Sequence, residues 1–289
     1  MRTKEWVQRM DTAARPLLLQ VGANVHADTS YENADPGPLC ARLGWASVLL
    51  EPIPHLFEQL RQRYADSPHI MPRRAAVCDS CAQREARMWL VDLTNASGRW
   101  GSNDSDPRCL GPKAAWLTEV ASLSRKHVER HASTFFGAEY TRGMCAECAV
   151  QQGRPLPADC LRNVVLQNLR EVSVPCFCLR DEVPQLGSVA LLLLDAEGRD
   201  YSILQQYPFA AVPTARVIFE AAHMSSTQFH AAGALLRAHG FLWVEGRLGA
   251  SMSVWHHVNS TEPFAWRLSR AGLVLEARNA SGTLAGAST

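Results

Sequence analysis

The sequence lacks a charge bias, a long apolar run and a dense set of cysteines. Its 289 residues carry 29 basic and 28 acidic side chains, for a formal net charge of +1. This balance gives no electrostatic reason to expect nucleic acid or an anionic membrane surface as the main partner. The longest apolar run, 189–194, has the length of a strand, whereas a membrane-spanning helix needs about 18 or more apolar residues. The start of the chain shows no signal-peptide pattern, so we expect a soluble, cytoplasmic protein without a membrane partner.

Cysteine is scarce, with nine positions in the whole chain. This number is too small for a disulfide scaffold, and being odd it leaves at least one cysteine unpaired within a monomer. We therefore expect a reducing compartment. Cys145, Cys148 and Cys160 could form part of a structural zinc site, with free thiols and disulfides as open alternatives. Cys78 and Cys81 have no thioredoxin-like setting and are interpreted as incidental.

Short, continuous apolar runs alternate with amphipathic segments over much of the chain. The runs predict strands at 16–21, 48–50, 70–77, 86–91, 172–177, 189–194 and 215–219, with a closing hairpin between 241 and 256. The amphipathic segments predict helices at 54–65, at about 201–206 and between Ser225 and Gly240. Apolar strands that alternate with helices are typical of a parallel sheet covered on both faces. We therefore expect an α/β fold with a doubly wound, mostly parallel sheet.

The middle of the chain interrupts this alternation. Residues 94–112 are rich in Gly, Ser, Asn, Asp and Pro, which predicts a loop, and the apolar spacing that follows predicts one long helix over 113–135. We interpret about 94–165 as an inserted helical cap. The expected organisation is a single domain over 1–289 that carries this cap and a flexible tail at about 279–289.

Turn-forming and acidic residues follow the first two predicted strands, where a parallel sheet binds its ligands. Gly22, Ala23 and Asn24 form a turn after the first strand, and a glycine there lets a ligand approach the backbone. Glu51 ends the second strand and is placed to accept hydrogen bonds from the ribose hydroxyls of an adenosine group. A turn without a ligand, and a carboxylate that only stabilises the next helix, are the competing interpretations.

Five segments along the chain resemble the signature of one enzyme family. They are Gln20-Val-Gly-Ala-Asn24, Leu49-Leu-Glu51-Pro, Ala75-Ala-Val-Cys-Asp79, Leu193-Leu-Asp195-Ala-Glu197-Gly198 and Val217-Ile-Phe-Glu220. In content and order they resemble FkbM-type S-adenosylmethionine-dependent methyltransferases, over about 17–245 apart from the predicted insertion. The resemblance implies a seven-stranded class I methyltransferase (Rossmann-like) sheet, S-adenosylmethionine as methyl donor, and a hydroxyl acceptor on a sugar or natural product.

The resemblance also implies a donor site, made by Gly22, Ala23, Asn24, Glu51, Val77, Asp79 and Asp195. The turn at Gly22 would approach the methionine part of the donor, and Glu51 would contact the ribose. Val77 and Asp79 would border the adenine, and Asp195 would lie beside the donor sulfur and the acceptor. The sequence departs from the family where His26 replaces a further Gly and where Leu194 replaces the common Lys before Asp195.

Methyl transfer to a hydroxyl is an in-line displacement, and holding the acceptor oxygen about 3 Å from the methyl carbon supplies much of the rate. A base that takes the hydroxyl proton adds a further factor. Asp195 and His223 are the candidate bases, with His26 as a third. Together with Glu197 and Glu220, the first two could also bind a divalent cation such as Mg²⁺ or Mn²⁺, and hydrogen bonding of these acids within the fold is the alternative.

The sequence therefore predicts an S-adenosylmethionine-dependent O-methyltransferase that acts on a small molecule or a glycan. Two other functions remain open, a nicotinamide-dependent oxidoreductase on a Rossmann-like sheet and a non-catalytic nucleoside-binding module of the same fold. The oxidoreductase is disfavoured because the first turn lacks Gly-x-Gly-x-x-Gly. The sequence indicates neither which acceptor is used nor the oligomeric state.

Overall fold

The computed structural model describes a large part of the chain. The described residues are 15–24, 40–41, 43–92, 117, 120–134, 142–143, 145–146, 149–150, 153, 160–245, 252–259, 264–269 and 272–277. The chain divides into two compact units, a first unit of Met1–Arg84 with Pro175–Thr289 and a second unit of residues 85–174. The segment that the sequence marks as an insertion, about 94–165, falls inside the second unit.

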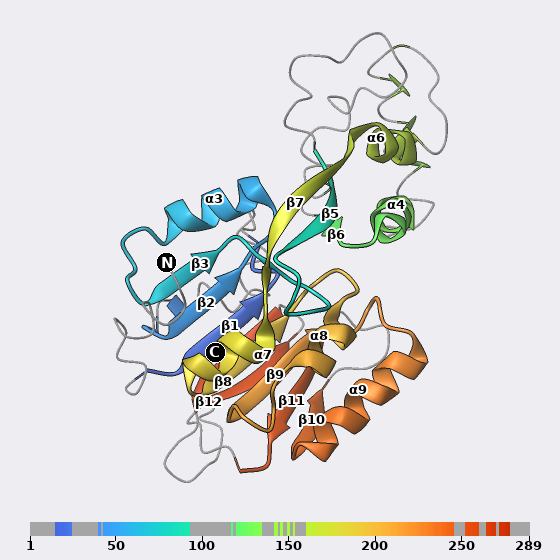
Figure 1. The fold of residues 1–289 in the computed structure, drawn as a ribbon. Helices are drawn as coiled ribbons and strands as arrows, with labels where there is room; N and C mark the ends of the chain where they lie inside the picture. The colour runs from blue at the N-terminus through green and yellow to red at the C-terminus, as the bar shows by residue number, and fades with distance from the viewer. Residues whose placement is uncertain are drawn as a thin grey trace, which may run out of the picture. The chain divides into compact units, whose positions relative to one another are not determined.

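A seven-stranded sheet forms the centre of the first unit (Figure 1). Its strands lie in the order β10-β11-β9-β8-β1-β2-β3. Neighbours pair in parallel except at β11, which runs antiparallel to β9 and to β10. The sheet is therefore mixed, with a single reversed strand. The strand bounds are Leu17–Val21 (β1), Ala46–Leu50 (β2), Ile70–Arg73 (β3), Val189–Leu194 (β8), Thr214–Glu220 (β9), Phe241–Glu245 (β10) and Met252–His257 (β11).

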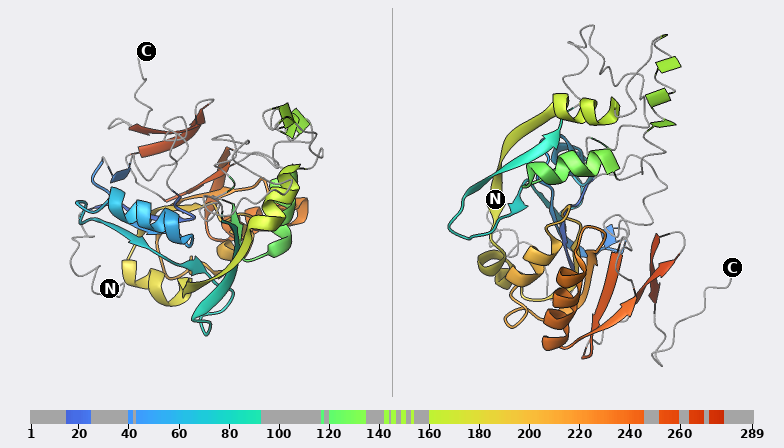
Figure 2. Two further views of the ribbon diagram at one scale, coloured as in Figure 1. Left: turned by 90° about the horizontal axis from the view of Figure 1, so that it is seen from above. Right: turned by 90° about the vertical axis from the view of Figure 1, so that its right-hand side faces the viewer.

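Helices lie on both faces of this sheet (Figures 1 and 2). β1, β2 and β8 are buried along their whole length, and successive residues of a strand face opposite sides. Leu19 packs in a core cluster with Leu204 and Leu236, whereas Leu18 packs in a second cluster with Leu60. The predicted α/β fold class is thus confirmed. The helices of this unit are α3 (Pro54–Arg63), α7 (Leu179–Glu182), α8 (Asp200–Gln206) and α9 (Ser226–Ala238), with a 3₁₀ helix, η5, at Val183–Leu186.

The predicted third strand, 70–77, is wrong in its second half. β3 ends at Arg73 on the edge of the seven-stranded sheet, and β4 (Ala76–Val77) pairs instead with the end of β7, where Val77 lies opposite Phe177. The apolar run could not show this division because an apolar pattern reports burial, and residues of both β3 and β4 are buried. Sequence periodicity does not say which neighbour a buried strand takes.

The second unit contains short elements that the sequence patterns resolved poorly. β5 (Glu85–Val91) pairs antiparallel with β6 (Ala121–Ser122), and α4 (Arg125–Thr134), α6 (Cys160–Asn168) and the first part of β7 (Leu169–Phe177) follow. The predicted helix over 113–135 is therefore too long. Its start was misplaced because Ser124 is a capping residue: its Oγ accepts a hydrogen bond from the N–H of His127, so the helix begins after it.

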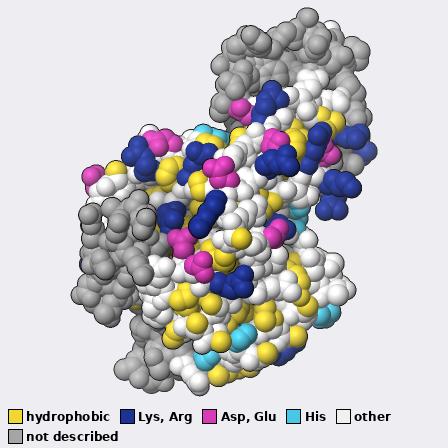
Figure 3. All heavy atoms as spheres, viewed as in Figure 1, with side chains coloured by type: hydrophobic (Ala, Val, Ile, Leu, Met, Phe, Trp, Pro, Cys, Tyr) yellow, Lys and Arg dark blue, Asp and Glu magenta, His cyan; other side chains and the backbone are white. Residues whose placement is uncertain are grey.

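The closing hairpin is confirmed, since β10 and β11 pair antiparallel at the edge of the seven-stranded sheet. A further hairpin, β12 (Phe264–Ser269) with β13 (Gly272–Ala277), was not anticipated from the sequence. Basic and acidic side chains lie interspersed on the face drawn in Figure 3, in keeping with the balanced composition. Among the described residues, no helix combines the length and the apolar character that crossing a bilayer requires.

Cysteines form three disulfides within the described part of the chain. The Cα atoms of the bonded pairs are 5.5, 5.0 and 5.8 Å apart, as disulfide geometry requires. The pairs are Cys78–Cys176, Cys81–Cys178 and Cys145–Cys160. The prediction of a zinc site is corrected, because Cys145 and Cys160 are bonded to each other and offer no thiolates to a metal; Cys148 lies outside the described residues. The interpretation of Cys78 and Cys81 as incidental was also wrong.

The first two disulfides, both within the first unit, join the segment after β4 to the end of β7 and its continuation. They span 98 and 97 residues, and closing one loop of that length stabilises a fold by about 4 to 5 kcal/mol in the chain-entropy model. The second bond adds much less, because the first already holds the same segments together. Disulfides form and persist in oxidising environments. The expectation of a reducing cytoplasm is therefore not supported.

Candidate functional site

The turns that follow β1, β2 and β8 meet at one edge of the seven-stranded sheet. β1 pairs in parallel with β2 on one side and with β8 on the other, so the carboxyl ends of the three strands lie together. The N–H groups of Gly22 and Ala23 both donate to the carbonyl of Leu50, each at an N···O distance of 3.0 Å. The N–H of Asp195 donates to the carbonyl of Val21 at an N···O distance of 2.9 Å. Backbone hydrogen bonds thus hold the predicted donor turn against the ends of both neighbouring strands.

Gly22 is required by a close backbone approach. Its φ is +79°, in the region that favours glycine, and a Cβ atom at this position would lie 1.7 Å from the carbonyl oxygen of Asp195. Asn24, two residues on, also has a positive φ, 39°. The sequence suggested that this glycine admits a ligand, whereas the structure assigns it first to the packing of the β1 turn against the β8 turn.

Glu51 lies directly after β2 and is 2 % exposed. Its Oε2 accepts a hydrogen bond from the N–H of Asn24 at an N···O distance of 2.9 Å, and its Oε1 accepts one from the N–H of Ile53 at 2.8 Å. The carboxylate therefore ties the β1 turn to the segment that enters α3. The Gly22–Asn24 turn and Glu51 therefore lie side by side, and the contact with Ile53, which precedes α3, agrees with the competing interpretation of an acid that supports the next helix.

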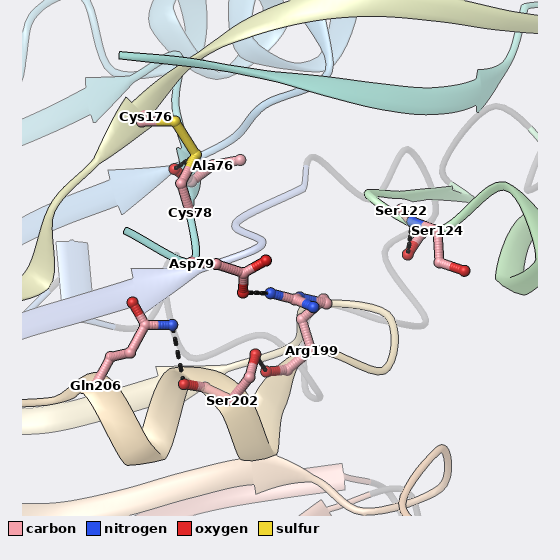
Figure 4. A network of polar contacts seen from close by, with 9 residues as sticks. All are labelled: Ala76, Cys78, Asp79, Ser122, Ser124, Cys176, Arg199, Ser202 and Gln206. Carbon is pink, nitrogen blue, oxygen red and sulfur yellow. Dashed lines mark hydrogen bonds and ion pairs between the residues drawn. A yellow bond between two sulfur atoms is a disulfide. The ribbon is translucent and has the colours of Figure 1, made fainter. Parts of the chain in front are cut away.

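The two residues expected beside the adenine have different surroundings. Val77 is 4 % exposed and belongs to the core. Asp79 has a side chain that is 68 % exposed and forms an ion pair with Arg199, the residue before α8 (Figure 4). An adenine at this position would share the Asp79 carboxylate with Arg199.

Carboxylates gather where β8 and β9 end. These strands are parallel neighbours, with Leu194 opposite Phe219, so the loops after them lie side by side. Nε2 of His223 lies 3.5 Å from Oε2 of Glu197 and 3.6 Å from Oε1 of Glu220. Of the four residues predicted for a base or cation site, Glu197 and Glu220 thus both lie near His223, and the charge of the fourth, Asp195, acts on the titration of Glu220. We call Asp195, Glu197, Asp200, Glu220 and His223 the acid cluster.

Burial and mutual repulsion control the titration of the acid cluster. Desolvation, followed by the charges of Asp195, Asp200 and Glu197, raises the pKa of Glu220 far above the ordinary range of a carboxylic acid. Desolvation is also the largest cause that raises the pKa of Asp200, to about 7, although backbone N–H groups oppose it. Acids with such raised pKa values in one place are a common property of functional sites.

The sequence patterns missed Asp200 and Arg199. Asp200 is the first residue of α8 and is 1 % exposed. Its Oδ2 accepts a hydrogen bond from the N–H of Ala196 at an N···O distance of 3.4 Å. An acid in the first turn of a helix is usually an exposed partner of the helix dipole, so its position in the sequence gave no sign of burial. The only available signal was its place five residues after Asp195, in the same predicted loop.

Within the described residues, two separate groups could hold a bound species. Glu51 and Asp79 offer carboxylate oxygens that suit the hydroxyls and amino group of a nucleoside, whereas the N–H groups of the Gly22–Asn24 turn are already donated to Leu50 and Glu51. The acid cluster offers carboxylate oxygens and an imidazole nitrogen, which are metal ligands. His26, the third candidate base, lies outside the described residues. No protein-family model matches the sequence, and no curated protein and no solved structure matches it either.

Proposed function

We propose that this protein is an S-adenosylmethionine-dependent methyltransferase that transfers a methyl group to a hydroxyl on a small molecule or glycan. The observation that carries the proposal is the convergence of the Gly22–Asn24 turn, Glu51 and Asp195 at the carboxyl ends of β1, β2 and β8. Each belongs to a segment that resembles the FkbM-type signature, and the fold brings these distant segments within hydrogen-bonding distance.

The topology of the sheet supports the same proposal. The chain moves from β1 to β2 and β3 on one side and later to β8 and β9 on the other, so the strand order reverses between β1 and β8. Open α/β sheets bind their ligands at such a switch point, outside the carboxyl ends of the strands. Gly22 and Asp195 lie there. A mostly parallel sheet of seven strands is also what the class I methyltransferase assignment calls for.

The residues present fit the donor. Glu51 supplies a carboxylate beside the first turn, where the two ribose hydroxyls of an adenosine would donate to it, and Asp79 supplies an acceptor for an exocyclic amino group. S-adenosylmethionine, when bound, supplies an electrophilic methyl group. Asp195 and His223 are the side chains that could take the proton from the acceptor hydroxyl.

Calorimetric titration of the purified, disulfide-bonded chain with S-adenosylmethionine, S-adenosylhomocysteine and NAD tests the proposal. We expect both sulfur nucleosides to bind and NAD not to bind. Glu51→Gln removes the charge that would accept the ribose hydroxyls, so it should weaken the binding of both sulfur nucleosides by about 10- to 100-fold, the usual value of hydrogen bonds to a charged group. Glu58→Gln, on the exposed surface of α3, is the matched control and should change nothing.

Binding of NAD without either sulfur nucleoside would overturn the proposal in favour of an oxidoreductase. Unchanged affinity in a folded Glu51→Gln variant would show that the ribose lies elsewhere. Circular dichroism of each variant at the temperature of the titration separates a loss of binding from a loss of folding.

A further inference from the structure

A cavity opens at the edge of the seven-stranded sheet that lies opposite the candidate site. Its volume is about 310 Å³, within the range of about 300 to 1,000 Å³ that is usual for small-molecule sites. Among the residues that line it, three begin strands: Val189 in β8, Thr214 in β9 and Phe241 in β10. Because β8 has 6 residues and Asp195 follows it, about 20 Å separates the cavity from the acid cluster. The cavity is therefore a second site and not an extension of the first.

Aromatic rings line the cavity and hold one another in place. The ring of Phe209 is stacked on the imidazole of His239, with centroids 5.1 Å apart and an interplanar angle of 28°. Phe241 meets Phe209 edge-on at a centroid distance of 5.5 Å and His257 edge-on at 5.1 Å. Such contacts are favourable arrangements of aromatic pairs, so the rings are oriented before any ligand arrives. A preformed set of rings suits a flat aromatic ligand, which loses little conformational freedom on binding.

The polar groups of the cavity are uncharged or are imidazoles. None of the described residues that line it is an Asp, Glu, Lys or Arg. His239 is partly buried, and in the part of the chain that the structure describes its imidazole contacts the ring of Phe209 but makes no hydrogen bond. A neutral imidazole has one nitrogen that accepts a hydrogen bond and one that donates. His239 can therefore accept a hydrogen bond from a ligand hydroxyl.

Two other polar side chains beside the cavity already have partners. Oγ1 of Thr214 shares a hydrogen bond of 2.8 Å with the hydroxyl of Tyr207. Nδ1 of His257 accepts a hydrogen bond from the N–H of Asn259, and its Nε2 faces the backbone just before β10. Of the partly buried side chains described here, His239 is thus the one whose hydrogen-bonding capacity is left for a ligand.

We propose that this cavity binds a small, uncharged aromatic molecule that carries a hydroxyl group, of the phenol or naphthol class. The ring of the ligand would lie against Phe209 and Phe241, and its hydroxyl would donate a hydrogen bond to the imidazole of His239. An ionised ligand is disfavoured, because its charge would lose hydration without gaining a charged partner among the described lining residues. The proposal does not rest on the proposed methyl transfer, since the two sites lie at opposite edges of the sheet.

Equilibrium dialysis of the whole, disulfide-bonded chain at pH 8, without any nucleoside, tests the site. Three probes share one ring system and differ in their polar group: 2-naphthol, naphthalene and 2-naphthoate. We expect one equivalent of 2-naphthol to bind, about fivefold more tightly than naphthalene, which is the usual effect of one neutral hydrogen bond. 2-Naphthoate should bind at least about tenfold more weakly than 2-naphthol, because the cavity offers its charge no partner.

Two variants locate the bound probe. Ser188 is an exposed residue that lines the cavity, so the indole of Ser188→Trp should obstruct it and weaken the binding of 2-naphthol at least about tenfold. Ser226→Trp, at the exposed first residue of α9, is the matched control and should leave the affinity unchanged. His239→Phe keeps a ring against Phe209 but removes the nitrogen acceptor, so it should abolish the preference for 2-naphthol over naphthalene. His230→Phe, on the exposed surface of α9, is its control.

The proposal would be overturned by no saturable binding of 2-naphthol at millimolar concentration, or by no preference for 2-naphthol over the other two probes. These comparisons use the unmodified chain and need no variant to fold. An affinity that Ser188→Trp leaves unchanged, or a preference that His239→Phe retains, would also overturn it, provided that circular dichroism shows the variant to be folded. Because no nucleoside is present, the outcome is independent of whether S-adenosylmethionine binds.

Discussion

Glu51 and Glu220 both lie at the carboxyl end of a strand in one sheet, and the fold treats their charges in opposite ways. Glu51 is 2 % exposed and accepts hydrogen bonds from two backbone N–H groups. The side chain of Glu220 is 12 % exposed, and its strongest electrostatic neighbours are three other carboxylates. The N–H groups replace the water that Glu51 loses, whereas the surroundings of Glu220 disfavour its charge. The difference separates an acid whose charge the fold stabilises from acids whose charge the fold disfavours.

The largest expected loss in the free energy of unfolding comes from a substitution that forces apart the turns after β1 and β8, the first of which donates a hydrogen bond to Glu51. Gly22→Ala would place a methyl group 1.7 Å from the carbonyl oxygen of Asp195 at a φ of +79°. Gly187 has nearly the same φ, +81°, with no atom near its would-be Cβ, so Gly187→Ala is the matched control for backbone strain alone. We expect a loss of about 1 kcal/mol in the free energy of unfolding for Gly187→Ala and at least about 3 kcal/mol for Gly22→Ala.

Guanidinium unfolding followed by circular dichroism measures both variants. Equal losses would mean that the turns after β1 and β8 can move apart without cost. The turn that donates to Glu51 would then not be held rigidly in place. If Gly22→Ala yields no folded protein while Gly187→Ala does, the close approach is essential for folding.

The next effect tests Glu51 itself. Glu51→Gln removes a charge that two N–H groups stabilise and turns an NH₂ group toward one of them, so that one buried N–H loses its acceptor. We expect a loss of about 2 kcal/mol in the free energy of unfolding. Glu58→Gln changes the same chemical group on the surface of α3, where it breaks only a solvent-exposed ion pair with Arg61, and it should therefore cost much less stability than Glu51→Gln. A Glu51→Gln variant as stable as the unmodified chain would make this acid equivalent to a surface carboxylate.

The sequence predicted what repeats along the chain. Buried strands at β1, β2, β8 and β9 followed from short apolar runs, and α9 followed from its capping residue: the Ser225 side chain accepts from the N–H of Gln228, and the Gln228 side chain accepts from the N–H of Ser225. Such signals are local, since each depends on residues within one turn or one strand.

The sequence could not show what depends on distant pairs. Cys78 and Cys176 are 98 residues apart, and no spacing rule connects them. The same holds for Val77, whose strand pairs with β7 rather than with the main sheet, and for Asp200, whose burial arises from the packing of α8. Most acids of the candidate site could therefore be predicted from the sequence. Whether the fold stabilises or disfavours the charge of each acid could be seen only from the residues that surround it in the structure.

The smallest expected effect concerns the acid cluster, through the pH dependence of stability. Burial raises the pKa of Asp200 from its ordinary 3.8 to about 7, with the charge of Glu197 acting in the same direction. Below pH 4 both the folded and the unfolded chain hold this proton, and between about 4 and 7 only the folded chain does. Its contribution to stability is therefore fully present below pH 4, falls as the pH rises, and is lost above about 7.

Asp200→Asn cannot titrate, so it removes this part of the pH dependence. In EDTA at pH 7.5 we expect a gain of about 1 kcal/mol in the free energy of unfolding, because the lost acceptor oxygen offsets most of what removing the charge contributes. At pH 4 the folded chain no longer carries this charge, so only the cost of the lost acceptor oxygen remains and the gain should turn into a loss. Guanidinium unfolding at both pH values measures the difference, and Asp66→Asn, at an exposed position after α3, serves as the control. A gain that is equal at the two pH values would show that Asp200 does not titrate in this range, and the acid cluster would then resemble Glu51 in carrying a charge that the fold accommodates.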